Sequence, residues 1–351
     1  MDIEQVIWGF TPEGEAEVLY TMTNARGASV SLTNIGASIV SVTVPDRNGK
    51  LADVALGYAR PEDYFGDGPY MGKTAGRYAN RIALGRFTLE SKEYRLAQNN
   101  GPNHLHGGPG GFANKLWTGR VETDRVVFAL TSPDGDEKYP GHLAVEVVYD
   151  WNDECELEIT YFAKTFDTTI INLTNHAYFN LRSENAGSEA MLAQKLRLNA
   201  SDFLPTDATQ IPTGEIAPVA GTPMDFRSPK AIGRDIAADY EPLKIGAGYD
   251  NCWAVDGWEK GRLCDVAVLT DEVSGRRMTV RSTQPGVQVY TGNWLQGCPT
   301  GKSGRDYGNR DGVAIECQAF PDSPNKPQFP STVLTPDEIY QETIIFKFDT
   351  V

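Results

Sequence analysis

The chain has 351 residues, enough for two average domains or one large β domain, and its 40% hydrophobic and 23% charged residues are ordinary for a globular protein. Its 32 basic and 47 acidic residues give a formal net charge of −15, which repels polyphosphate and argues against nucleic acid as a partner. A neutral small molecule remains compatible with this balance.

The N-terminal residues carry acids where a signal peptide would carry bases, and no run approaches the roughly 18 apolar residues that a membrane span requires. The five cysteines are odd in number and form no Cys-x-x-Cys pair, which disfavours a disulfide framework and a thiolate zinc site. We therefore expect reduced thiols, a cytoplasmic location and no membrane partner.

Alternation with a period of two dominates the chain and predicts β-strands. It appears in residues 125–130, 143–151, 157–163, 277–281, 287–291 and 343–348. Turn sequences rich in Gly, Pro and Asp separate these stretches, as at residues 46–49 and 133–135. Only residues 188–198 allow a helical interpretation, and the end of that segment alternates like a strand.

The sequence contains no internal repeat, low-complexity segment or linker at which it could be divided. The proline-rich residues 321–330 have strand-like sequence on both sides and are interpreted as an ordered loop. Dense strands with few short helices over the whole length predict an all-β protein, with residues 1–351 forming one large β-sandwich domain.

Two of the four histidines occur in the segment Asn-His-Leu-His-Gly-Gly at residues 103–108. On a strand, His104 and His106 would share one face, as in metal sites of the cupin type. Such sites place a glutamate four or five residues after the second histidine, but Gly110 and Gly111 stand there. A metal site is therefore disfavoured, and the glycine pair at 107–108 indicates a close backbone approach.

A third histidine, His176, lies in a strand-like run at residues 170–181 that also contains Asn172, Asn175 and Asn180. A histidine in such a run is more often a hydrogen-bonded core residue than a catalyst. The asparagines favour a functional interpretation, because amides match hydroxyl-rich ligands and can fix an imidazole tautomer. The fourth histidine, His142, begins a strand and is interpreted as structural.

Glu316 is the only charged residue in the apolar segment 312–320. Burial of a carboxylate without partners costs several kcal/mol or raises its pKa. The sequence leaves two interpretations open, a satisfied ion pair or a carboxyl group tuned for proton transfer.

Two further segments carry polar groups able to bind oxygens. Residues 77–82 contain Asn80 and Arg81, although arginines at this spacing are also common on surfaces. Residues 246–251 place Asp250 in a glycine-rich turn, where capping its own loop is the default role.

Together and in this order, these segments resemble the aldose 1-epimerase (galactose mutarotase) family over nearly the whole chain. The resemblance rests on residues 76–82, 105–108, 111–112, 172–176, 178–181, 212–216, 222–227, 248–250, 283–288, 290–293, 316, 321–322 and 325–327. No single segment is specific, but so many in register are hard to obtain by chance.

The resemblance implies a galactose mutarotase-like β-sandwich with a shallow sugar cleft, no cofactor and no metal. It implies that His176 is the general acid and Glu316 the general base. The positions that match sugar-binding residues of the family are Asn80, Arg81, His106, Tyr178, Asp250 and Gln284. His104 stands where the family more often has a small polar residue, and Asn251 where it often has histidine.

The expected reaction interconverts the α and β anomers of free aldoses such as galactose and glucose, with no partner beyond the sugar and a monomeric or homodimeric chain. A non-catalytic carbohydrate-binding sandwich would explain the strands, aromatic residues and amides, but not the isolated Glu316. Two more functions stay open, that of an epimerase acting on a phosphorylated hexose and that of a cupin-like metalloenzyme.

Overall fold

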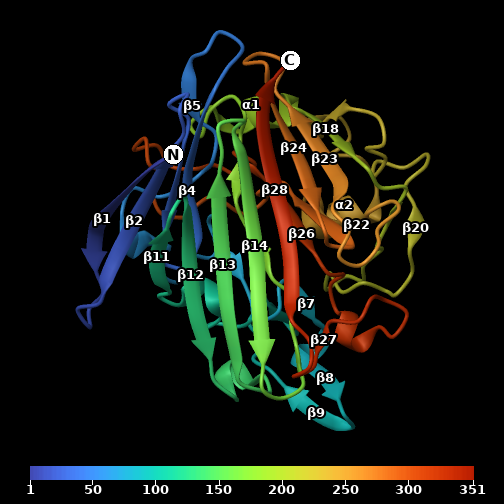
Figure 1. Cartoon of the computed structure of the whole chain (residues 1–351). Coiled ribbons are helices and arrows are strands. Elements are labelled where there is room, and N and C mark those ends of the chain that lie inside the picture. The colour runs from blue at the N-terminus through green and yellow to red at the C-terminus, as the bar shows by residue number, and fades with distance from the viewer.

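Antiparallel strands in three larger sheets form most of the regular structure of this computed structural model, which describes residues 1–351 (Figure 1). The largest sheet has nine strands and forms the long curved layer at the front of Figure 1. In spatial order it consists of β11 (Thr118–Glu122), β12 (Arg125–Ser132), β13 (Leu143–Trp151), β14 (Glu156–Thr165), β28 (Tyr340–Thr350), β24 (Arg276–Ser282), β23 (Cys264–Thr270), β18 (Lys195–Leu198) and β21 (Lys230–Ala231).

The second sheet lies behind the first and carries the polar residues of most interest. Its order is β17 (Tyr178–Phe179), β26 (Val313–Gln318), β25 (Gly286–Tyr290), β22 (Asp250–Ala254), β19 (Asp202–Phe203) and β20 (Ala217–Pro218). A five-stranded meander at the N-terminus consists of β1 (Asp2–Phe10), β2 (Ala16–Thr23), β3 (Ser29–Thr33), β4 (Ser38–Pro45) and β5 (Leu51–Asp53).

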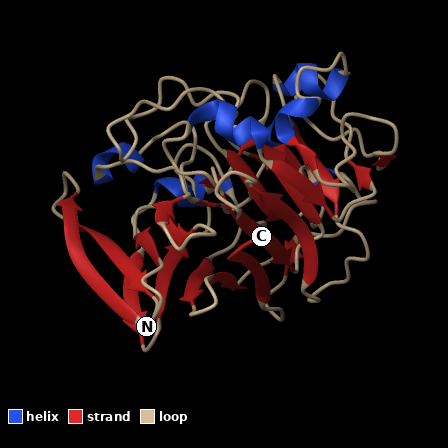
Figure 2. Cartoon of the chain, turned by 90° about the horizontal axis from the view of Figure 1, so that it is seen from above, coloured by secondary structure: helices blue, strands red, loops and turns tan.

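Short two-stranded ladders tie the connecting segments together. They pair β6 (Thr74–Ala75) with β16 (Thr174–Asn175), β7 (Arg81–Ile82) with β10 (His104–Leu105), β8 (Arg86–Leu89) with β9 (Lys92–Arg95), and β15 (Thr169–Ile170) with β27 (Val333–Leu334). The two α-helices, α1 (Gly187–Ala193) and α2 (Glu241–Gly246), are short (Figure 1). The helical segments of the chain lie in connections beside the strands (Figure 2). Neither α-helix is long and apolar enough to cross a membrane.

The core lies between the nine-stranded sheet and the two other larger sheets. Alternate residues of β13 and β14 face it, and Phe179 of β17 packs on Phe346 of β28 with ring centroids 5.1 Å apart. One cluster of 59 buried residues extends from Val18 to Phe348. The predicted all-β sandwich with few helices is confirmed.

Two details differ from the sequence prediction. Residues 188–198 form a helix followed by a strand, because α1 ends at Ala193 and β18 begins at Lys195. The run at 170–181 is not one strand, because β15, β16 and β17 each pair with a strand of a different sheet. His176 lies between two of these short strands, where the chain passes from one sheet to the next.

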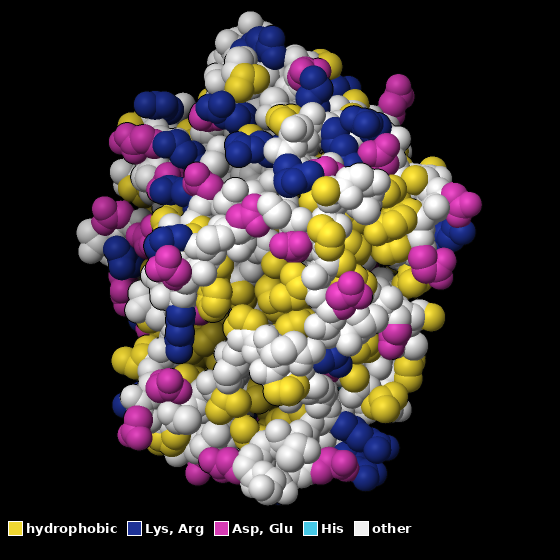
Figure 3. All heavy atoms as spheres, turned by 90° about the vertical axis from the view of Figure 1, so that its right-hand side faces the viewer, with side chains coloured by type: hydrophobic (Ala, Val, Ile, Leu, Met, Phe, Trp, Pro, Cys, Tyr) yellow, Lys and Arg dark blue, Asp and Glu magenta, His cyan; other side chains and the backbone are white.

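The surface is uneven in polarity. On the face that carries β20 and β22, hydrophobic side chains gather around hollows in the middle, while charged side chains occupy the upper part and the rim (Figure 3).

Candidate active site

A polar cleft of about 210 Å³ lies at one edge of the six-stranded sheet. Seven of the eight residues that the sequence predicts for the site line it, although they come from five separate segments of the chain. These seven are His176, Glu316, Asn80, Arg81, His106, Tyr178 and Asp250. The fold therefore brings together residues as far apart in sequence as Asn80 and Glu316.

His176 and Glu316 face each other at the base of this cleft. The Nε2 atom of His176 lies 3.5 Å from Oε1 of Glu316, and both side chains are at least 95% buried. The second carboxyl oxygen of Glu316 and Nδ1 of His176 have no hydrogen-bond partner. Because buried polar atoms are nearly always paired, these two unpaired atoms mark the pair as unusual for a protein interior.

Burial disfavours charge on both members of this pair. It raises the pKa of Glu316 well above 4.5, helped by the negative charge of Asp250 and opposed by Arg81. It lowers the pKa of His176 to about 4, against smaller effects of a backbone hydrogen bond and of Asp250. Both shifts favour the uncharged forms, in which the exchangeable proton of the pair lies on Glu316 and not on His176.

The backbone of His176 is fixed by the segment that precedes β6. Its N–H donates to the carbonyl of Lys73 at 2.8 Å, and its carbonyl accepts from Gly72 at 3.1 Å. The three neighbouring asparagines bind backbone groups of adjacent segments and do not contact the imidazole. The expectation that they fix its tautomer is therefore wrong, and they join the strands around His176 instead.

The two histidines of the His-x-His segment point to different places. His106 has a left-handed backbone, with φ at 50°, so the period-two alternation of a strand ends at this residue. Its Nδ1 accepts a hydrogen bond from the Asn80 N–H at 3.1 Å, which leaves the proton of the neutral ring on Nε2. Burial lowers its pKa well below 6.5, with further lowering by His176 and Arg81.

His104 points away from the cleft into the protein. Its ring nitrogens lie 2.7 Å from the carbonyl of Ala97 and 2.7 Å from the hydroxyl of Tyr139, so both are paired. The glycine after His106 explains the close approach that the sequence predicts, because a Cβ on Gly107 would lie 1.9 Å from the carbonyl oxygen of Gly76. The backbone, and no ligand, makes this approach.

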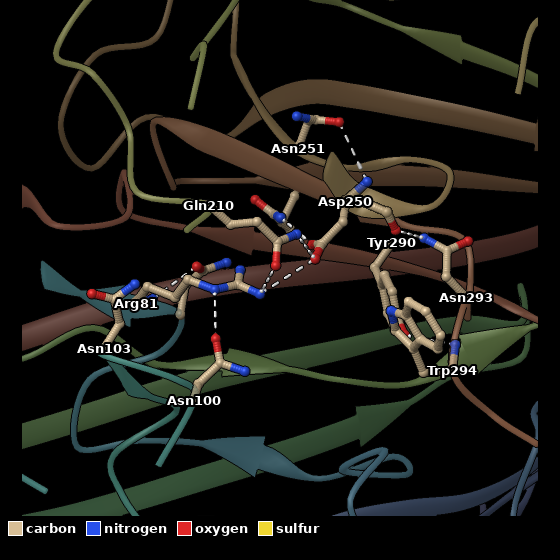
Figure 4. Close-up of polar contacts among 12 residues, drawn as sticks. Arg81, Asn100, Asn103, Gln210, Asp250, Asn251, Tyr290, Asn293 and Trp294 are labelled. Atoms are coloured by element: carbon tan, nitrogen blue, oxygen red, sulfur yellow. Dashed lines mark hydrogen bonds and ion pairs between the residues drawn. The ribbon is translucent and has the colours of Figure 1, made fainter. Parts of the chain in front are cut away.

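Asp250 is the centre of a hydrogen-bond network in the cleft wall (Figure 4). Its Oδ1 accepts from Gln288 Nε2 at 2.7 Å, and its Oδ2 accepts from Gln210 Nε2 at 2.6 Å. Arg81 approaches the same Oδ2 at 3.4 Å. Asn251 lies apart from this network, with its side-chain oxygen on the Asp250 N–H at 3.3 Å.

Gln284 is the one predicted site residue that the structure places elsewhere. It donates to the Tyr340 hydroxyl at 3.1 Å and lines a separate cavity at the end of the sandwich. Gln288 takes the position beside the cleft, directly opposite Glu316 in the pairing of β25 with β26. The alternation of β25 could have shown this, because Val287 and Val289 face the core and leave Gln288 on the face of Glu316.

Aromatic side chains form the remaining walls. The ring of Tyr178 lies 5.1 Å from that of His176, and its hydroxyl donates to the Pro69 carbonyl at 2.9 Å. Tyr70 packs on His106 with ring centroids 4.7 Å apart, and Trp294 stands at the rim with 70% of its surface exposed. Tyr70, Asn100 and Gln210 line the cleft without any distinguishing sequence signal, whereas Tyr290 begins a segment that carries the family resemblance.

The cleft also contains side chains of the type that hold metal ions. The potential ligand atoms of His106, His176 and Glu316 all lie within 4.8 Å of one another. An ion with ligand bonds of about 2.0–2.2 Å would draw such atoms closer together. The same three groups suit proton transfer and hydrogen bonding to hydroxyl groups without an ion.

Comparison with known proteins agrees with this geometry. The sequence profile of the family described as aldose 1-epimerase matches residues 18–347. The chain is 42% identical over 348 residues to galactose mutarotase of Bos taurus, covering 99% of each chain, and 36% identical over 340 residues to aldose 1-epimerase of Escherichia coli K12, covering 96% of each.

Solved structures resemble it over the same length. An aldose epimerase homologue from C. elegans superposes with a TM-score of 0.87 at 31% identity, covering 96% of this chain and 100% of the other. Galactose 1-epimerase from Lactobacillus acidophilus gives 0.85 at 29% identity, with 99% of each chain covered. The chain therefore belongs to the aldose 1-epimerase family and is a carbohydrate isomerase.

Proposed function

We propose that this chain interconverts the α and β anomers of free aldoses, galactose and glucose among them, with Glu316 as base and His176 as acid. The observation that carries the proposal is the apposition of these two groups, 3.5 Å apart at the base of a polar cleft. Ring opening needs a base at the C1 hydroxyl and an acid at the ring oxygen at the same time. A carboxyl–imidazole pair that shares one proton provides a base and an acid at the same time.

The reaction begins when the proton of Glu316 moves to His176, which leaves the net charge of the pair unchanged. Arg81 and the hydroxyl groups of the sugar stabilise the carboxylate, in keeping with the lowering effect of Arg81 on the pKa of Glu316. Glu316 then accepts the C1 hydroxyl proton while His176 donates its proton to the ring oxygen. The C1–O5 bond breaks, and the C1 oxygen becomes the aldehyde carbonyl.

Rotation about C1–C2 presents the other face of the aldehyde, and the same steps in reverse close the ring. Asp250, Arg81, Asn80 and His106 would hold the ring hydroxyls during this rotation. Gln288 donates a hydrogen bond to Asp250 and orients it. Gln288 therefore has the role in sugar binding that the sequence assigned to Gln284. Tyr178 and the exposed Trp294 would cover an apolar face of the sugar.

The competing functions fit the cleft less well. A binding module without activity would not require a buried carboxyl group with an unpaired oxygen against a histidine. A phosphorylated hexose would need cations, but Arg81 is the only lysine or arginine that lines the cleft, and it is already bound by Asn100 and Gln210. Two carboxyl groups, those of Asp250 and Glu316, also face this space.

We further propose a cytoplasmic, monomeric or homodimeric protein that needs no cofactor. The five cysteines are free, and three of them are buried, which is compatible with a reducing compartment.

Polarimetry of freshly dissolved α-glucose, α-galactose and a pentose, with and without the protein, tests the activity. The protein should accelerate the change in optical rotation toward the same end value, and dialysis against EDTA should leave the rate unchanged. Rates equal to those without protein would refute the proposal. Activity lost to EDTA and restored by zinc or manganese would instead show a metal enzyme.

A further inference from the structure

Gln210 occupies an unusual place in the cleft wall. It lies in the loop between β19 and β20, where its backbone adopts the left-handed conformation with φ at 64°. This conformation is uncommon for residues other than Gly, Asn and Asp, and is retained where the surroundings impose it. The loop therefore holds Gln210 in a specific orientation.

Contacts on both sides build this loop. The Asp207 carboxylate accepts from the backbone N–H of Thr209 at 2.7 Å and from that of Ile211 at 3.2 Å. Asn103 Nδ2, from the segment before His104, donates to the carbonyl of Thr209 at 3.1 Å. Gln210 is thereby aimed into the cleft by residues that do not themselves line it.

The Gln210 side chain is inserted between an arginine and an aspartate (Figure 4). Its Oε1 accepts from Arg81 Nη2 at 2.7 Å, and its Nε2 donates to Asp250 Oδ2 at 2.6 Å. The direct contact between Arg81 and Asp250 is longer, at 3.4 Å. The amide thus makes the stronger contact with each ion.

A guanidinium and a carboxylate left alone in a partly buried site tend to close into a bidentate pair. Such a pair would turn the donors of Arg81 and the acceptors of Asp250 toward each other and away from the sugar. The amide of Gln210 occupies Nη2 of Arg81 and Oδ2 of Asp250, so the two ions meet only in one long contact and not in a bidentate pair. A pair of adjacent hydroxyl groups can then donate to one ion and accept from the other.

We propose that Gln210 is a positioning residue that sets which arrangement of adjacent sugar hydroxyls Arg81 and Asp250 accept, and so determines the preference of the cleft among aldoses. This inference rests on the proposed function. It assigns Gln210 no part in proton transfer, since the amide contacts neither His176 nor Glu316. Loss of Gln210 should therefore change KM and the ranking of sugars more than kcat.

Three variants separate the possible roles. Gln210→Ala removes the bridge and keeps a side chain in the left-handed backbone, whereas Gln210→Gly removes the bridge and relieves that backbone. Gln210→Glu keeps an acceptor for Arg81 but sets a second acceptor against Asp250. Gln328→Ala is the matched control, because Gln328 donates to the Gly214 carbonyl of the same loop at 3.1 Å from outside the cleft.

We expect Gln210→Ala and Gln210→Gly to raise KM for glucose and galactose by about tenfold, as for the loss of hydrogen bonds to charged groups. The ratio of kcat/KM between the two sugars should change several-fold, and kcat should stay within about threefold of wild type. Gln210→Glu should bind both sugars more weakly still. The thermal midpoint of Gln210→Gly should equal or exceed that of wild type, and Gln328→Ala should match wild-type kinetics.

Wild-type KM and an unchanged sugar ratio in Gln210→Ala would overturn the inference. So would an equal kinetic change in Gln328→Ala, which would show that loop anchoring, and not the bridge, matters. Calorimetric titration of wild type and Gln210→Ala with each sugar keeps this test separate from the proposed function. If the wild-type protein binds sugar without converting its anomers, the proposed function fails, while the change in sugar preference on binding still decides the role of Gln210.

Discussion

Two cavities of this molecule show which structural features identify a candidate active site. The cleft of about 210 Å³ is smaller than the cavity of about 590 Å³ at the end of the sandwich, which is walled by residues such as Trp258, Pro285 and Leu334. The larger cavity has the volume expected for a small-molecule site. The smaller one holds the converging polar groups, so volume alone would select the wrong place.

Each cavity also contains a carboxyl group with a raised pKa, that of the half-buried Glu342 and that of the buried Glu316. Burial raises the pKa of Glu342 in the end cavity to about 7, and that of Glu316 in the cleft well above 4.5. The carboxyl group of Glu342 accepts a hydrogen bond from the Thr283 hydroxyl, whereas one oxygen of Glu316 is unpaired and the other faces His176. An unpaired oxygen beside a complementary acid–base group distinguishes the cleft.

The largest expected effect concerns the acid of the cleft. His176→Ala should lower kcat by roughly 10²–10⁴-fold, the usual contribution of a positioned acid or base. The double variant with Glu316→Gln should lose less than the product of the single losses, because both residues serve one proton transfer. Polarimetric kcat values check this after circular dichroism shows each variant folded. Independent, multiplicative losses would argue against a shared proton.

The two histidines of residues 104 and 106 should differ in the same assay. His106→Ala removes a donor that lines the cleft and should lower kcat/KM by about 10–100-fold. His104→Ser leaves the Tyr139 hydroxyl without its partner, so it should lower the thermal midpoint while the activity per folded molecule stays close to wild type. The opposite ranking would show that His104, and not His106, contacts the sugar.

The two glutamines of the cleft and the end cavity should also differ. Gln288→Ala removes the donor to Asp250 Oδ1 and should raise KM by about tenfold. Gln284→Ala removes a contact with Tyr340 in the end cavity and should leave KM unchanged. Measuring both in parallel with galactose decides between them. A larger effect from Gln284 would restore the assignment made from sequence.

The smallest effect is a change in how stability depends on pH. The pKa of Glu342 is about 7 in the folded chain, above its ordinary value of 4.5, so over this interval the folded state holds a proton that the unfolded state releases. Stability should therefore fall as pH rises from about 4.5 to 7. Glu342→Gln should flatten this dependence in urea unfolding at several pH values. A parallel curve for wild type and variant would exclude Glu342 as its source.

The fold could be predicted from local patterns in the sequence, whereas most of the cleft could be predicted only from the resemblance to a family. Alternation in residues 143–151 corresponds to β13, and an isolated acid in an apolar segment marks Glu316 as buried. Resemblance to a family supplied what alternation could not, namely that Asn80, His176 and Glu316 meet in space. These residues are far apart in the chain, and no local pattern around any of them shows that they lie close together in the fold.

The remaining differences arise where the backbone leaves regular geometry. His106 and Gln210 adopt left-handed conformations, so alternation does not describe where their side chains point. Gln284 precedes β25, where alternation has not yet begun, and its burial against Tyr340 depends on a residue 56 positions away. Such contacts follow from tertiary packing, which the local sequence does not encode.

The proton shared by His176 and Glu316 is central to the proposed mechanism. Glu316→Gln keeps the size of the side chain but can neither accept nor donate this proton, and Glu342→Gln is the matched change in the other cavity. On the acidic side, kcat/KM of wild type should fall near pH 4, where His176 becomes positively charged. On the alkaline side it should fall as the shared proton of the His176–Glu316 pair is lost.

The most direct measurement is the polarimetric rate of folded Glu316→Gln and Glu342→Gln beside wild type across this pH range. We predict a loss of roughly 10²–10⁴-fold in Glu316→Gln, with no alkaline fall in its residual activity, and wild-type rates in Glu342→Gln. A folded Glu316→Gln protein that turns over near the wild-type rate would contradict the mechanism.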